Sequence, residues 1–181
     1  HMIHHGMPDG QVRSTDEIVG TVGTMIVGGF QEPAHGAANT MLGLLAVPEQ
    51  AAAVAADPRR WSGPAVQEGL RWISPFNMTE KLTTADTVIG GMLIPAATEV
   101  ALVIGSANRD ESRFDNSDVF DLRRPRLNNY AFGFGSHFCV GHYVARMVAQ
   151  ISVEELFLRL PHLRLDPDRE PFVHGWFVRA G

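Results

Sequence analysis

Cysteine is almost absent from this chain, because Cys139 is the only one among 181 residues. A single thiol excludes an internal disulfide framework and is compatible with a reducing cytoplasm. The sequence also lacks an apolar run long enough to span a membrane, and its start lacks the charged-then-apolar layout of a signal peptide. These absences predict a cytoplasmic protein that has no membrane partner.

An excess of basic residues is missing as well. The chain has 15 Lys and Arg against 20 Asp and Glu, which gives a formal net charge of −5, and its basic residues are scattered. This balance excludes a general nucleic-acid surface. With a hydrophobic content of 45%, the chain is long enough for one domain with a substantial core. We interpret residues 1–11 as an expression scar and flexible leader, and residues 12–181 as a single domain.

The lone cysteine lies in a glycine-punctuated loop that leads into an amphipathic helix. Gly133 and Gly135 permit a tight backbone with positive φ, and Phe132 and Phe134 supply apolar walls. The start of the helix places unpaired N–H groups and the positive end of its dipole near the sulfur of Cys139, which favours the thiolate. A thiolate is a metal ligand, so this loop is the candidate metal site.

The same loop carries a family resemblance. In the run F-G-F-G-S-H-F-C-V-G, the haem-ligand signature of the cytochrome P450 family is matched at every defining position, namely Phe132, Gly135, His137, Cys139 and Gly141. Taken alone, a single cysteine is ordinarily a small buried hydrophobic residue, but the match of the whole run favours haem. The chain thus resembles the carboxy-terminal core of a bacterial cytochrome P450, which implies a mainly α fold with small β-sheets, truncated at both ends.

The resemblance also implies the cofactor and its contacts. Haem b is expected, with Cys139 as the axial iron ligand, because a cysteine thiolate in this family pushes electron density onto haem iron. His137 and Lys81 are expected at the propionates. The remaining implied cofactor contacts are Phe132, Gly133, Phe134, Gly141, Ala145, Gly28 and Gly29.

A long helix precedes this region. Ser14 and Glu17 form a capping box, and apolar residues recur at helical spacing through residues 18–45. Pro33 predicts a bend, since it cannot donate a hydrogen bond to the carbonyl of residue 29. From the residues alone this is a kinked core helix. By resemblance it is the helix above the oxygen-binding face, where Gln31 and Glu32 replace the family's acid–alcohol pair and Glu32 is the candidate proton relay.

Two further helices are expected. Residues 48–57 form a short helix that ends at Asp57-Pro58, and Ser62-Gly63-Pro64 begins the next one. On that helix Glu68 and Arg71 share one face because they are three residues apart. They form either a surface ion pair or, by resemblance, the family's Glu-x-x-Arg pair, which Arg124 completes as a structural triad.

The middle of the chain is predicted to form strands, and its last part is predicted to form a helix followed by closing strands. The expected elements are an alternating strand from Lys81, a hairpin over residues 88–95, a strand over residues 100–104, a long loop to Leu127, a helix after Cys139, and closing strands over residues 161–165 and 172–179. The helix after Cys139 is expected to pack inward through Val140, Val144, Met147, Val148 and Ile151. By resemblance, Phe76 and Trp176 contact the substrate.

Two functions follow from the resemblance. The first is a haem-thiolate monooxygenase that inserts one oxygen atom from dioxygen into a small apolar substrate, with electrons from a ferredoxin and its reductase or from a flavoprotein. The second is a non-catalytic haem-binding or apo scaffold. The long helix from Ser14 would expose an apolar flank, so we expect a homo-oligomer, formed by exchange of this helix between copies.

Overall fold

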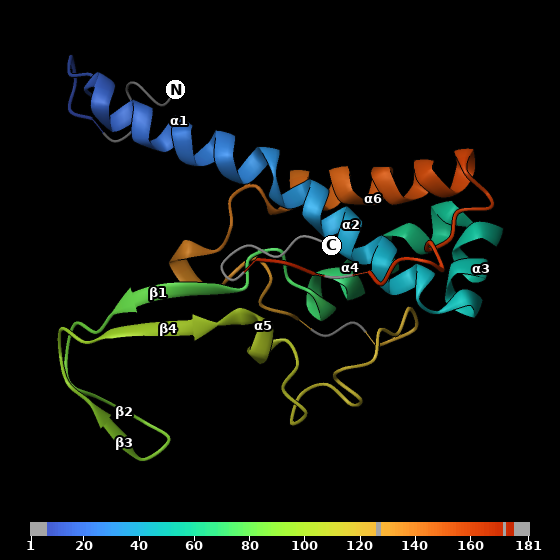
Figure 1. The fold of residues 1–181 in the computed structure, drawn as a ribbon. Coiled ribbons are helices and arrows are strands. Elements are labelled where there is room, and N and C mark those ends of the chain that lie inside the picture. Colours follow the sequence, from blue (N-terminus) through green and yellow to red (C-terminus); the bar gives the residue numbers. More distant parts are fainter. Residues whose placement is uncertain (1–6, 126–127, 172, 176–181) are drawn as a thin grey trace.

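The computed structural model describes residues 7–125, 128–171 and 173–175. It is mainly helical with two small antiparallel sheets, which confirms the predicted fold class (Figure 1). Helices α2 (Glu32–Leu45), α4 (Pro58–Trp72) and α6 (His142–Arg159) lie together in one body, and α1 (Thr15–Phe30) reaches beyond it (Figure 1). Within the described residues, no helix is long and apolar enough to cross a membrane.

Helices α1 (Thr15–Phe30) and α2 (Glu32–Leu45) form the predicted long helix with its break. At the start of α1, Ser14 Oγ accepts a hydrogen bond from the Glu17 N–H at 3.3 Å, and Glu17 Oε2 accepts one from the Ser14 N–H at 2.8 Å. The break falls at Gln31, two residues before Pro33, which has no N–H to continue the ladder. Both the capping box and the break are therefore confirmed.

Helices α3 (Pro48–Ala56) and α4 (Pro58–Trp72) follow, and the predicted start of α4 was wrong. Asp57 caps α4, since its side chain accepts a hydrogen bond from the Arg60 N–H at 3.2 Å. Ser62 lies inside α4 and is fully buried. The Asp57-Pro58 pair both ends one helix and begins the next, because proline is well suited to the first helical turn.

The core forms where α2, α4 and α6 (His142–Arg159) pack against one another. Leu44, Val66 and Val153 are essentially inaccessible to solvent at its centre. Helices α2 and α4 approach closely at Gly69, where an added Cβ would lie 2.1 Å from Thr40 Oγ1. Only glycine allows this contact, which fixes α4 against the helix that carries Glu32.

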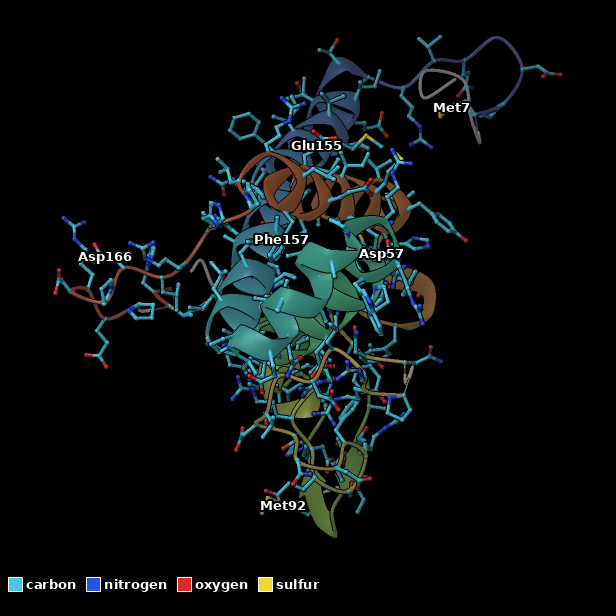
Figure 2. All side chains as sticks on the ribbon, turned by 90° about the vertical axis from the view of Figure 1, so that its right-hand side faces the viewer. Met7, Asp57, Met92, Glu155, Phe157 and Asp166 are labelled. Carbon is cyan, nitrogen blue, oxygen red and sulfur yellow. The ribbon has the colours of Figure 1, made fainter. Side chains whose placement is uncertain are left out.

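The face of α6 that packs inward differs from the predicted one. The buried face consists of Ala149, Val153 and Phe157, and Figure 2 shows Phe157 on the side of α3 and α4. The predicted inward residues are exposed: Val140 84%, Val144 59%, Met147 54%, Val148 41% and Ile151 52%. The prediction was wrong because α6 is apolar on two faces in its first half, and spacing alone does not say which face is covered.

The two sheets lie on one side of the helical body (Figure 1). Strand β1 (Met78–Leu82) pairs with β4 (Glu99–Val103), and β2 (Thr87–Ile89) pairs with β3 (Met92–Ile94). The β2–β3 hairpin is confirmed, with Gly90 and Gly91 at its turn in positive φ. Strand β1 begins three residues before Lys81, and the short helix α5 (Ile104–Ala107) ends the predicted strand at Val103.

The structure tests only one of the two predicted closing strands in full. Residues 161–165 form a turn followed by chain without regular secondary structure, so the predicted strand was wrong. The Leu163 N–H donates to the Leu160 carbonyl at 3.1 Å, which makes a turn at the end of α6 instead of a ladder. Within residues 172–179, only His174 of the described residues takes part in a bridge, and Trp176 lies outside the described residues.

Candidate functional site

The loop that carries Cys139 is shaped by its backbone. Gly133 and Gly135 have φ of 71° and 66°, the left-handed region that favours glycine. A one-turn 3₁₀ helix follows at Gly135–His137, and the Cys139 N–H donates back to the Phe132 carbonyl at 2.9 Å. This bond closes the loop, so the side chain of Cys139 is held at a fixed place on its rim.

Cys139 is tied to the start of α6 through its carbonyl. The His142 N–H donates to the Cys139 carbonyl at 3.3 Å, and His142 Nδ1 lies 2.8 Å from the same oxygen. Cys139 itself is partly exposed, so its sulfur is not sealed within the core. An added Cβ at Gly141 would lie 3.9 Å from Sγ, which is an ordinary contact, so the sulfur does not require glycine there.

A cavity of about 930 Å³ lies between α1, α2, the β1–β4 sheet and the Cys139 loop. Elements far apart in the sequence thus contribute to one apolar space, within the size range of sites for small molecules and cofactors. The cavity brings together most of the residues that the sequence singles out: Gly28, Glu32, Phe76, Lys81, Phe132, Gly133, Phe134, His137, Cys139 and Ala145.

Among the described residues, three of the predicted catalytic and cofactor-binding residues do not line this cavity. Gln31 is exposed, and it contributes its backbone to the break, where its carbonyl accepts from the His35 N–H at 3.0 Å. Gly29 is exposed on α1, and no other side chain would crowd a Cβ added there. Gly141 caps α6 outside the cavity. Glu32 therefore lines the cavity and Gln31 does not, although the sequence predicted that the two residues act as a pair.

Glu32 is the acidic group of the cavity. Its Oε2 is buried and has no hydrogen-bond partner among the described residues. A buried carboxylate oxygen without a partner is costly unless water or a ligand occupies the space before it. One turn along α2, the buried Nδ1 of His35 also lacks a partner within the described part of the chain. Glu32 therefore brings a carboxylate to the wall of a mostly apolar cavity, and one of its oxygens is buried without a hydrogen bond among the described residues.

The sequence did not identify several cavity residues. On α1 they are Gly23, Thr24 and Val27, which lie beside the predicted Gly28, and on the sheet they are Thr79 and Leu102. Thr24 could have been found, because it lies four residues before Gly28 and therefore on the same helical face. Leu102 could not, since no local pattern tells that β4 reaches the cavity.

The predicted triad forms one buried network behind the Cys139 loop. Arg71 donates to Glu68 through Nε at 2.8 Å and through Nη2 at 2.7 Å, and Arg124 Nε donates to Glu68 Oε1 at 3.0 Å. Arg71 also donates to the carbonyls of Asn108, Ser117 and Val119. The network thereby fastens the irregular segment before the Cys139 loop to α4.

Arg146 is a further residue that the sequence did not identify. Its guanidinium lies over the Phe132 ring, 4.4 Å from the ring centroid. Burial lowers the pKa of Arg146 below its ordinary value, although the neighbouring Tyr143 and Cys139 oppose this shift. This cation–π contact joins α6 to the loop that carries Cys139.

Comparisons with known proteins agree with the geometry. The family model described as Cytochrome P450 matches residues 64–173. Cytochrome P450 107B1 of Saccharopolyspora erythraea is 39% identical over 158 residues, which cover 87% of this chain and 39% of that protein. Cytochrome P450 monooxygenase PikC of Streptomyces venezuelae is 36% identical over 159 residues, which cover 87% of this chain and 38% of that protein.

Solved structures show the same likeness. A crystal structure of the hydroxylase HmtN superposes with a TM-score of 0.90 at 32% identity, over 99% of this chain and 47% of that chain. The chain thus spans about two fifths of the curated relatives it matches and just under half of this solved structure.

Proposed function

Because this chain belongs to the cytochrome P450 family, we propose that it binds haem b with Cys139 as the axial iron ligand and contributes this site to a monooxygenase. The reaction we propose inserts one oxygen atom from dioxygen into a small apolar substrate. The observation that carries the proposal is the shared cavity, which Cys139 lines from one loop and Glu32 from α2.

The residues present fit the cofactor. The cavity is large and its walls are mostly apolar, with glycines at positions 133 and 135 and aromatic rings at Phe132 and Phe134. Lys81 and His137, which line the same space, would neutralise carboxylate groups of the ligand. Covalent attachment through a C-x-x-C-H motif needs two cysteines, and the chain has one, so the haem would be held non-covalently.

Each of the proposed site residues then has a defined role. When bound, haem iron with a thiolate ligand supplies the chemistry that favours O–O cleavage. The closed loop around Cys139 holds the sulfur in place, and the mostly apolar walls bind the apolar faces of the ligand and substrate. Glu32 holds and passes a proton, because it is the one carboxylic acid among the described residues that line the cavity. Phe76 contacts the substrate.

Electrons would come from a ferredoxin with its reductase or from a flavoprotein, and the protein would work in the cytoplasm, where its single thiol stays reduced.

The alternative function is a scaffold that binds haem without turnover. It shares Cys139 with the proposal but needs no proton-passing group, so the presence of Glu32 in the same cavity as Cys139 favours the enzyme.

Haem ligation is tested by the carbon monoxide spectrum of the reduced protein after reconstitution with haem. We expect a thiolate-type spectrum that Cys139→Ala abolishes, whereas Glu155→Gln, an exposed change on α6, leaves it intact. A thiolate-type spectrum that persists in Cys139→Ala would refute the ligand assignment.

Turnover is tested separately by product formation. We expect Glu32→Gln to slow the dioxygen-dependent reaction by about a hundredfold or more. Glu49→Gln is the matched control, because Glu49 occupies the first turn of α3 and is exposed. Haem binding without product, even with a surrogate oxidant, would favour the scaffold.

A further inference from the structure

Arg146 joins helix α6 to the loop that carries Cys139 through an aromatic ring. Its guanidinium lies 4.4 Å from the centroid of the Phe132 ring, the shortest cation–π contact in the described part of the chain. The ring of His142, one turn earlier on α6, makes a T-shaped contact with the same ring, with 6.2 Å between the two centroids. The side chain of Phe132 is therefore held by two residues of α6.

The backbone of Phe132 continues this connection to the residue that bears the sulfur. Its carbonyl accepts a hydrogen bond from the Cys139 N–H at 2.9 Å. Gly133 and Gly135 lie between the two residues in positive φ, so the loop reverses its direction over a short stretch. A shift of the Phe132 ring would thus reach the backbone of Cys139 through one hydrogen bond. Arg146 therefore bears on the position of Cys139 through Phe132.

Arg146 also carries a charge that acts on Cys139. Burial lowers the pKa of Arg146, and the charges of Tyr143 and Cys139 raise it in part. The interaction between two charges is mutual, so a guanidinium that the Cys139 thiolate stabilises also stabilises that thiolate. An arginine side chain does not lose its proton in proteins, so this positive charge is permanent.

The charges around Arg146 are unequal in number. Arg146 lines a cavity of about 410 Å³ together with Glu68, Arg71 and Arg124. Glu68 already accepts hydrogen bonds from both Arg71 and Arg124. Three arginines and one glutamate line this cavity, so positive charge is in excess among the described residues that border it.

We propose that Arg146 is a positioning residue for the thiolate ligand: it holds the Cys139 loop through Phe132, and its charge raises the reduction potential of iron bound to Cys139. The second part rests on the proposed function, in which Cys139 is the axial ligand. Reduction by one electron makes the iron–thiolate unit more negative by one charge. A permanent positive charge beside the sulfur stabilises this reduced state more than the oxidised state.

The first test needs no haem. Amide hydrogen exchange of the apo protein, followed by mass spectrometry, measures how firmly the loop over residues 131–141 is held. We expect Arg146→Met to accelerate exchange in this loop about threefold or more, because the Phe132 ring loses its cation–π partner. Exchange in the buried part of α4 should stay the same, which checks that the variant is folded. Unchanged exchange in the loop overturns the proposal, whether or not the protein binds haem.

The second test is the reduction potential of the iron in the protein reconstituted with haem, measured by a spectroscopic titration with dithionite. We expect Arg146→Met to lower the equilibrium constant for reduction about threefold to tenfold, which is about 30–60 mV for a one-electron couple. Arg146→Lys keeps the charge and should keep most of the potential, although it loses the planar group above the ring. An unchanged potential in Arg146→Met overturns the proposal, and so does an equal loss in Arg146→Lys.

Arg60 supplies the matched control. It is exposed in the first turn of α4, its guanidinium lies 5.0 Å from the centroid of the Trp61 ring, and it does not line the cavity that contains Cys139. Arg60→Met removes the same charge and the same kind of contact, and it should change neither the exchange of the loop nor the potential. Equal effects of Arg60→Met and Arg146→Met would overturn the proposal.

The carbon monoxide spectrum separates this inference from the proposed function. A wild-type protein without a thiolate-type spectrum refutes the ligand assignment, and the exchange test then still decides whether Arg146 holds the loop. A wild-type protein and an Arg146→Met variant that share the thiolate-type spectrum and have one and the same potential refute the role of the Arg146 charge.

Discussion

The buried network at Glu68 permits a quantitative test of what holds the Cys139 region in place. Glu68 accepts hydrogen bonds from Arg71 through Nε and Nη2, from Arg124 through Nε, and from the Asp121 N–H at 2.9 Å. Glu68 and Arg71 are almost inaccessible to solvent, at 5% and 2%. The change Glu68→Gln keeps the shape of the side chain but removes its charge and turns one acceptor into a donor.

The cost follows from what remains after the change. Two guanidinium groups would stay close together with no carboxylate between them, and the new amide N–H would face a donor of Arg71. Removing one partner of a buried ion pair costs about 3–5 kcal/mol, mainly because the remaining charge is uncompensated. A domain is stable by only about 5–15 kcal/mol. We therefore expect Glu68→Gln to remove a large fraction of the free energy of unfolding.

Urea unfolding followed by far-ultraviolet circular dichroism measures this difference. The matched control is Glu155→Gln on α6, where Glu155 accepts from Arg159 at 2.6 Å but the two side chains are 44% and 78% exposed. An exposed helical pair of this kind contributes less than about 1 kcal/mol. If Glu68→Gln lowered the free energy of unfolding by no more than Glu155→Gln does, the network would be no more than a surface ion pair, and our reasoning would be refuted.

Two further predictions concern glycine packing and acid pH. Gly69→Ala should destabilise the protein by about 1–3 kcal/mol in urea unfolding, because its Cβ would meet the backbone of Thr40 at 2.8 Å. Gly63→Ala on the same helix should be neutral or stabilising, because its nearest contact is 3.4 Å from a flexible side chain. Hydrogen bonds from the Ser14 N–H and hydroxyl lower the pKa of Glu17, so the contribution of Glu17 to helix α1 is present above its unfolded pKa and lost as pH falls through the lowered value. Amide exchange at the start of α1 should therefore accelerate in acid, and Glu17→Gln should remove that dependence.

Local signals predicted the parts of the fold that local chemistry determines. The capping box at Ser14, the break before Pro33 and the turn at Gly90-Gly91 each depend on a few neighbouring residues, and all three were predicted. The start of α4 was wrong because Asp57-Pro58 serves as both a stop and a start, and only the stop was recognised.

Nonlocal packing was harder to predict. The buried face of α6 depends on where α2 and α4 lie, and both faces of α6 carry the apolar spacing that the prediction used. The cavity likewise depends on strand β4 lining the same space as the loop around Cys139, which no periodicity reveals. Phe76 and Lys81 were placed at the cavity by resemblance to a family and not by spacing. The sequence therefore reached the site through its motif and missed the walls that distant elements supply.

The cavity has one firmly held side and one loosely held side, and this difference predicts a coupling. Glu32 lies on α2, which packs against α4 and α6, whereas Thr24 and Gly28 lie on α1, which buries no residue. A ligand that contacts both sides must hold α1 in place, so haem binding should slow amide hydrogen exchange along α1. Hydrogen exchange followed by mass spectrometry, with and without haem, measures this effect. Unchanged exchange in α1 together with slower exchange in the Cys139 loop would mean that the ligand does not contact the α1 wall.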